Sequence, residues 1–93
     1  MVIVTGWLQV EPLMRQSFLS GCEPVIRQAR AHPECSQYVL APDPILADRV
    51  HVFEAWATPE AVTRFREKGQ QPAVMRLIAD AKVEQFQAQA CPL

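Results

Sequence analysis

Hydrophobic residues follow two different periods along this chain, and the changes of period mark its elements. Over residues 2–10 the alternate positions Val2, Val4, Leu8 and Val10 form one apolar row, and Ile3, Thr5 and Trp7 form a second row on the other side. Both rows are largely apolar, which predicts a strand that is covered on both faces. Glu11-Pro12 ends the strand, and Pro12 suits the first turn of a helix, where its missing N–H has no intrahelical partner.

A helical pattern then extends over residues 13–31. The apolar positions recur every three or four residues: Met14, Phe18, Cys22, Val25 and Ala29, with Leu19 and Ile26 beside them. This stripe predicts one helix packed on a sheet. Pro24 cannot donate to the carbonyl four residues back, so we expect a kink or a short interruption over 20–24. His32-Pro33 ends the helix.

Two further strands are expected at residues 35–41 and 49–57, joined as a hairpin by a long loop with proline and aspartate. Thr58-Pro59-Glu60 then combines an N-cap oxygen, a proline at the first helical position and an acid in the first turn. These three residues predict a helix that starts at Pro59 and ends at Gly69. Its expected core side chains are Ala61, Val62 and Phe65.

The end of the chain predicts a short helical segment and a last strand. Pro72 opens the segment, which carries Val74, Leu77 and Ile78. Alternation over residues 81–93 predicts a fourth strand at a sheet edge. Strand, helix, strand, strand, helix, strand is the order of a ferredoxin-like α+β fold, a four-stranded antiparallel sheet with both helices on one face.

The opposite face of such a sheet would be bare and apolar. It would carry Ile3, Trp7 and Phe53, and a second copy stacked sheet to sheet is the simplest cover. We therefore expect a homodimer. The length of 93 residues, with no linker or low-complexity segment, indicates a single domain over 1–93.

Composition and charge exclude several partners. The net charge is −1, and 49% of residues are hydrophobic, with no basic stripe for phosphates and no apolar run long enough to span a membrane. Nucleic acid and membrane partners are not expected. The three cysteines, Cys22, Cys35 and Cys91, are an odd number that argues against a disulfide framework and for a reducing compartment. With no signal-peptide pattern at the N-terminus, we expect a cytoplasmic protein.

The sequence resembles a known family. The stretches VIVTGWLQVEPLMRQSFL and FEAWATPEAVTRF, together with the length, are similar to the antibiotic biosynthesis monooxygenase domain. The most specific element is Glu54-Ala55-Trp56 followed by the capped helix start. The resemblance covers nearly the whole chain and implies a dimeric α+β barrel.

The same resemblance implies a chemistry. Members of the family oxidise electron-rich phenols or quinols with molecular oxygen and without metal or flavin, by holding a deprotonated substrate that reduces oxygen directly. The implied function is therefore a cofactor-independent monooxygenase of a small aromatic or quinol substrate. In the implied site Trp56 positions the ring, Arg76 stabilises the oxyanion, and Glu54 orients the substrate or accepts a proton.

Two positions depart from the family pattern. Val52 stands where active relatives can carry an asparagine, and Phe65 stands where a histidine is often found. Haem degradation is disfavoured, because no histidine lies between Pro59 and Ile78. The alternative is a non-catalytic ligand-binding or assembly module of the same fold.

Other candidate residues keep two interpretations each. A buried Glu54 could act as a base, or it could form an inert ion pair with Arg76, Arg66 or Arg49, which is the simpler expectation. Tyr38 and Trp7 could line a ligand pocket or a dimer interface. Arg64, Arg66, Glu67 and Lys68 are most simply a solvated helix face.

The two histidines are expected to be structural. His51 has the opposite strand parity to Trp56 and should lie on the dimer-facing side. His32 closes the first helix, where it offsets the helix dipole. Its spacing from Cys35 does not make a zinc site, because a proline lies between them and no second ligand pair exists. We therefore assign no metal and no cofactor.

Overall fold

The chain folds into one four-stranded antiparallel sheet and two α-helices. The computed structural model describes residues 1–69 and 72–93. The strands are β1 (Val2–Val10), β2 (Cys35–Pro42), β3 (Arg49–Trp56) and β4 (Ile78–Gln87). The helices are α1 (Arg15–Ala31) and α2 (Pro59–Lys68), and the short 3-10 segments η1 (Pro12–Met14) and η2 (Ala73–Leu77) precede α1 and β4.

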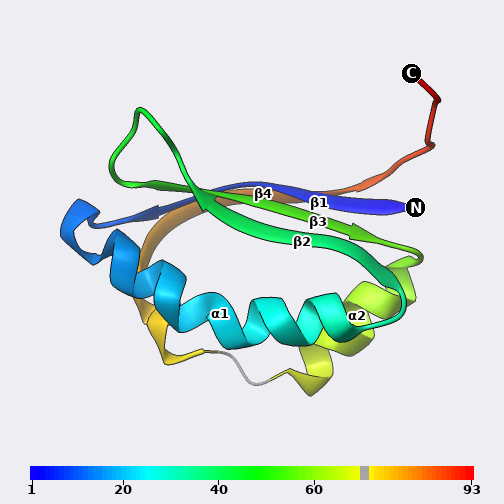
Figure 1. Cartoon of the computed structure of the whole chain (residues 1–93), viewed down its shortest axis with the longest axis horizontal. Coiled ribbons are helices and arrows are strands. Elements are labelled where there is room, and N and C mark those ends of the chain that lie inside the picture. Colours follow the sequence, from blue (N-terminus) through cyan, green and yellow to red (C-terminus); the bar gives the residue numbers. More distant parts are fainter. Residues whose placement is uncertain (70–71) are drawn as a thin grey trace.

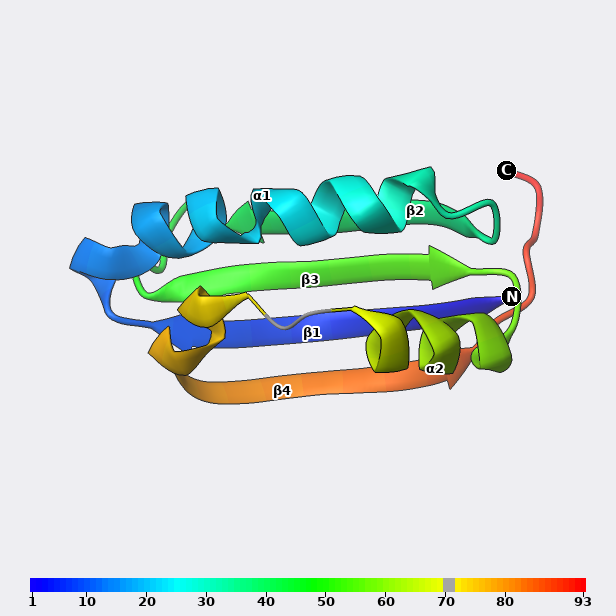
Figure 2. The same cartoon turned by 90° about the horizontal axis from the view of Figure 1, so that it is seen from below.

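The strand order in the sheet is β2-β3-β1-β4, and every neighbouring pair is antiparallel. Both helices lie on the same face, α1 along β2 and β3 and α2 nearer β1 and β4 (Figure 1, Figure 2). The predicted ferredoxin-like arrangement is therefore confirmed. None of the helices in the described residues is long and apolar enough to cross a membrane.

The core lies between the sheet and the helices, on the side that the alternation predicts. From the sheet it contains Val2, Val4, Leu8 and Val10 of β1 and Val50, Val52 and Trp56 of β3. From α1 it contains the predicted stripe, Phe18, Cys22, Val25 and Ala29. Thr58 caps α2 as expected, its hydroxyl accepting from the backbone N–H of Ala61 at 3.1 Å.

Two details of the first helix differ from the sequence interpretation. Residues Pro12–Met14 form a 3-10 turn, in which the Met14 N–H donates to the Glu11 carbonyl at 2.8 Å, so α1 begins only at Arg15. Pro24 lies inside α1 without interrupting it. A helix that is packed along its apolar stripe tolerates the loss of one hydrogen bond.

The last strand is also placed differently. It covers Ile78–Gln87 and not 81–93, so Ile78 belongs to β4 and not to the short helical segment. Residues 88–93 follow without regular structure. Pairing with β1 decides these limits, because the ladder runs from Val10 and Ile78 to Val2 and Gln87. Strand β4 is at a sheet edge, as predicted.

No element in the described residues covers the second face of the sheet, which is the upper side in Figure 1. Phe53 and Phe86 are 36% and 47% exposed there. Trp7 lies on the same face, and the guanidinium of Arg49 stacks over its ring at 4.3 Å. Trp7 is thus separated from Tyr38, which is buried on the helix side.

Candidate functional site

A buried carboxyl group lies near the end of β3, on the face of the sheet that the helices cover. Glu54 is 6% exposed and Trp56 is 1% exposed. Being two residues apart on one strand, they point to the same face of the sheet. The indole Nε1 of Trp56 donates to Oε1 of Glu54 at 2.9 Å. The prediction that these two residues lie on the same face of the sheet is therefore confirmed.

A cation from α2 faces the same carboxyl. Nη2 of Arg66 lies 3.8 Å from Oε2 of Glu54, and the Arg66 side chain is 50% exposed. Burial raises the pKa of Glu54 above its usual value, although the Trp56 hydrogen bond and the Arg66 charge act in the opposite direction. Of Arg76, Arg66 and Arg49, Arg66 is therefore the one that pairs with Glu54. The net shift of the Glu54 pKa is still upward, because burial outweighs the ion pair.

Tyr38 is the third polar group at this place. It lies directly opposite Glu54 in the pairing of β2 with β3 and is itself buried. Burial raises the pKa of the Tyr38 hydroxyl, and the negative charge of Glu54 raises it further. The phenol therefore keeps its proton and can donate a hydrogen bond.

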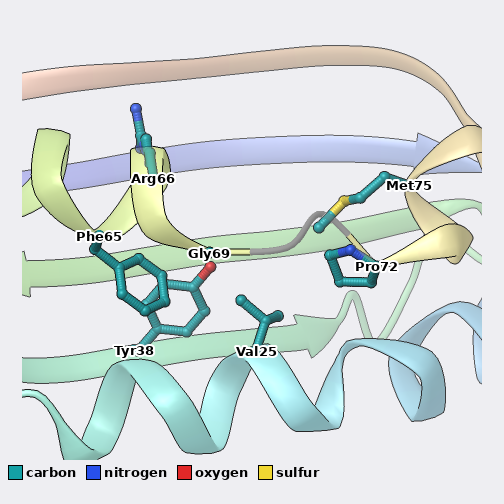
Figure 3. Close-up of a pocket in the computed structure, with 7 residues that line it drawn as sticks. All are labelled: Val25, Tyr38, Phe65, Arg66, Gly69, Pro72 and Met75. Carbon is teal, nitrogen blue, oxygen red and sulfur yellow. The ribbon is translucent and has the colours of Figure 1, made fainter.

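Two of these side chains, Tyr38 and Arg66, line a cavity of about 170 Å³ between α1, β2 and α2, and Glu54 lies behind them and is not among the described lining residues. The walls of the cavity are Val25, Tyr38, Phe65, Arg66, Gly69, Pro72 and Met75, and we call it the aromatic cavity. Figure 3 shows Val25 reaching in from α1, Tyr38 from β2 and Phe65 from α2. Most of the lining is apolar, and polar groups come from Tyr38 and Arg66. A mostly apolar lining with a few polar groups is typical of small-molecule sites.

Trp56 supports this cavity from behind. It is not among the described residues that line it, but its ring lies 5.2 Å from the ring of Phe65. The Phe65 ring in turn meets Tyr38 edge to face at 6.0 Å. Trp56 therefore holds the Glu54 carboxyl and packs against Phe65, which forms one wall of the cavity. It does not lie where it could stack directly on a ligand in the aromatic cavity.

Arg76 lies elsewhere. It is an exposed residue of η2 and does not line the aromatic cavity. The cation that the structure places beside Glu54 is Arg66, which the sequence offered both as a possible ion-pair partner of Glu54 and as part of a solvated helix face. For Tyr38 the sequence allowed two interpretations, a pocket residue or an interface residue. The pairing register of β2 with β3 decides between them, because it places Tyr38 opposite Glu54. A bulge between Cys35 and Gln37 sets that register, and no sequence signal announces it.

The two histidines lie apart from the Glu54 carboxyl. His51 is exposed on the uncovered face as expected, and its Nε2 pairs with Oδ2 of Asp43 at 2.6 Å within the same chain. His32 closes α1, and its ring meets the edge of Trp56 at 5.5 Å.

The geometry was compared with known proteins. No family model and no curated protein matches the sequence. Solved structures do match. A conserved protein from Methanosarcina mazei is 14% identical with a TM-score of 0.83, over 95% of this chain and 92% of that one. A protein from Nitrosomonas europaea provisionally named antibiotic biosynthesis monooxygenase is 13% identical with a TM-score of 0.82, over 97% of this chain and 100% of that one.

A third structure carries the same provisional name. It comes from Caulobacter crescentus, is 20% identical and has a TM-score of 0.82, over 96% of this chain and 90% of that one. This chain has the fold of these proteins. The resemblance seen in the sequence is thus confirmed as a likeness of fold, and at such identities the activity has to be argued from the site itself.

Proposed function

We propose that this protein is a cofactor-independent monooxygenase that acts on a small aromatic or quinol substrate held in the aromatic cavity. The observation that carries the proposal is the buried Glu54 carboxyl, which lies behind a cavity bordered by Tyr38 and Arg66. A buried titratable group beside an apolar pocket is a common sign of a reaction site. The provisional names of the structural neighbours support the same chemistry.

The reaction needs no external reductant. A substrate carbon between oxygenated rings loses a proton, and the resulting carbanion gives electrons to molecular oxygen. A carbon–oxygen bond forms, and the resulting peroxide anion takes up a proton to give a hydroperoxide. Loss of water then leaves a carbonyl on that carbon, so one oxygen atom enters the product and the other becomes water. Both electron pairs come from the substrate.

Each side chain has a role that its position supports. Glu54 accepts the substrate proton, and its raised pKa makes it a stronger base than an exposed carboxylate. Tyr38 and Arg66 border the cavity and stabilise negative charge on the substrate oxygen. Arg66 takes the role that the family resemblance implied for Arg76. Trp56 is a positioning residue, since it holds Oε1 of Glu54.

Oxygen uptake with a hydroxylated anthrone tests the proposal. Glu54→Gln should lower turnover by about 100-fold or more, the usual contribution of a general base. Arg66→Met should also lower it, whereas Arg27→Met, which removes an exposed cation of α1 that does not line the cavity, should not. Added metal or flavin should have no effect. Unchanged turnover in both site variants would overturn the assignment.

A non-catalytic ligand-binding module is the second candidate. One observation favours it, because both oxygens of Glu54 already face partners, Trp56 at 2.9 Å and Arg66 at 3.8 Å. Such a protein would bind an anthrone by calorimetry without any oxygen uptake. The same pair of measurements therefore separates the two functions.

We also propose that a second copy covers the apolar face of the sheet. The exposed Phe53 and Phe86 support this, since single domains rarely leave aromatic side chains gathered on one face. Light scattering should give twice the mass of the chain. Phe53→Asp should give the mass of one chain with an unchanged circular dichroism spectrum, and a wild-type protein of single mass would contradict the dimer.

A further inference from the structure

A second cavity of about 170 Å³ adjoins the aromatic cavity. Its walls are Gln28, His32, Arg64, Phe65, Lys68 and Gly69, and we call it the basic cavity. Phe65 and Gly69 belong to both cavities. A ligand that passes Phe65 would therefore reach from one to the other.

The helical period explains why the two cavities differ in chemistry. Phe65 lies on α2, and Gly69, four residues on, is the C-cap residue that follows it, its N–H donating to the Phe65 carbonyl at 2.9 Å. Arg64 and Lys68, also four apart, lie on one side of these two residues, and Arg66 lies on the other. One turn of helix thus presents an apolar divider with cations on both sides.

The basic cavity carries net positive charge. No carboxylate is among the described residues that line it, and two of its side chains, Arg64 and Lys68, are cations. Oε1 of Glu34 holds Nη2 of Arg64 at 2.8 Å, and the Thr58 hydroxyl donates to the other oxygen of Glu34 at 3.3 Å. Glu34 thereby fixes the Arg64 guanidinium, which has five N–H donors, and the charge of Lys68 is not balanced by Glu34.

His32 adds a hydrogen-bond donor. Its Nδ1 accepts from the backbone N–H of Glu34 at 3.2 Å, so the ring N–H lies on Nε2. The edge contact with Trp56 at 5.5 Å holds the ring plane. With the Gln28 amide, the basic cavity offers donors and cations on several sides.

We propose that the basic cavity binds the carboxylate of an aromatic acid whose ring lies in the aromatic cavity. The substrate class is thus a hydroxylated aromatic carboxylate, an inference that rests on the proposed function for the place of the ring. Each cavity alone is smaller than the roughly 300 Å³ at which small-molecule sites begin, and together they reach it. Arg64 and Lys68 are the specificity-determining residues.

Calorimetry with two probes tests the inference. The probes are 2-naphthol and 3-hydroxy-2-naphthoate, which differ by the carboxylate. The wild type should bind the naphthoate at least about tenfold more tightly, as one charge-assisted hydrogen bond would give. Arg64→Met and Lys68→Met should each remove most of that gain and leave the affinity for 2-naphthol unchanged. Lys68→Arg and the control Arg27→Met should keep it.

Two kinds of outcome separate this inference from the proposed function, and a third overturns both. Equal affinities for the two probes, or variants that weaken both probes alike, would overturn the carboxylate subsite and leave the aromatic cavity in place. Selective naphthoate binding without oxygen uptake from any substrate would support the subsite and reject the oxygenase. Binding of neither probe would overturn the subsite and ligand binding in the aromatic cavity together.

Discussion

The two faces of the sheet carry similar side chains in opposite surroundings. On the helix side Glu54 and Trp56 are buried and joined by a hydrogen bond. On the uncovered side Arg49 stacks over Trp7, and His51 pairs with Asp43. Each face thus has an indole with a charged partner, but the pKa values of the two carboxyl groups shift in opposite directions. Burial raises the pKa of Glu54, whereas hydrogen bonds hold the pKa of Asp43 well below its usual range.

The difference shows that the balance between burial and hydrogen bonding sets the direction of each pKa shift. Trp56 donates to Glu54 as His51 pairs with Asp43, and both contacts favour the ionised carboxylate. The Glu54 side chain is 7% exposed and the Asp43 side chain is 16% exposed, so both lose contact with water. At Glu54 this loss outweighs the partners, whereas at Asp43 the hydrogen bonds outweigh it. A site built in this way depends on α2 staying packed over the end of β3.

The largest expected effect comes from cutting back the two indoles. Trp56→Ala should cost about 3 to 5 kcal/mol of unfolding free energy, as for other buried tryptophans. Trp7→Ala should cost about 1 kcal/mol, the scale of a half-exposed cation–π contact. Urea denaturation at two protein concentrations would measure both and reveal any contribution of association. Similar losses at the two positions would show that the faces are not different in packing.

The next effect concerns the charge of Glu54. Because its folded pKa is raised above the ordinary value of 4.5, the wild type loses stability as the pH rises from that value through the folded pKa. Glu54→Gln keeps an acceptor for Trp56 and removes the charge. It should be more stable than the wild type by on the order of 1 kcal/mol at neutral pH and equally stable below pH 4.5.

Chemical denaturation at several pH values from 4 to 8 would follow this difference. Glu60→Gln, a change of the same kind at an exposed residue of α2, is the control and should show no such gain. A stability difference between Glu54→Gln and the wild type that does not vary with pH would contradict a raised pKa.

The smallest effect is expected on the uncovered face. Oδ1 of Asp43 accepts from the backbone N–H groups of Ile45 and Leu46 at 2.8 and 2.7 Å, so Asp43→Ala should speed amide exchange in the β2–β3 loop. With its pKa depressed, Asp43 stabilises the fold above its ordinary pKa, and that contribution is lost as the pH falls through the folded pKa. Exchange should therefore differ from the wild type throughout neutral pH. Unchanged exchange at Ile45 and Leu46 would refute this role.

Local patterns in the sequence were sufficient for most of the fold. The period-two rows of β1, the stripe of α1 and the Thr58 cap are short-range signals, and the structure confirms each of them. The end of the chain was less well predicted, because β4 has exposed residues on both faces and its limits come from pairing with β1. An edge strand of this kind has little periodicity of its own.

The sequence by itself determined which residues share a face. Parity on β3 placed Glu54 beside Trp56, because neighbours two apart on a strand cannot point to opposite sides. Only the tertiary structure decided what meets them. The register of β2 brought Tyr38 opposite Glu54, and the packing of α2 brought Arg66 to the carboxyl while Arg76 stayed exposed. Contacts between distant segments depend on register and helix placement, which no local pattern encodes.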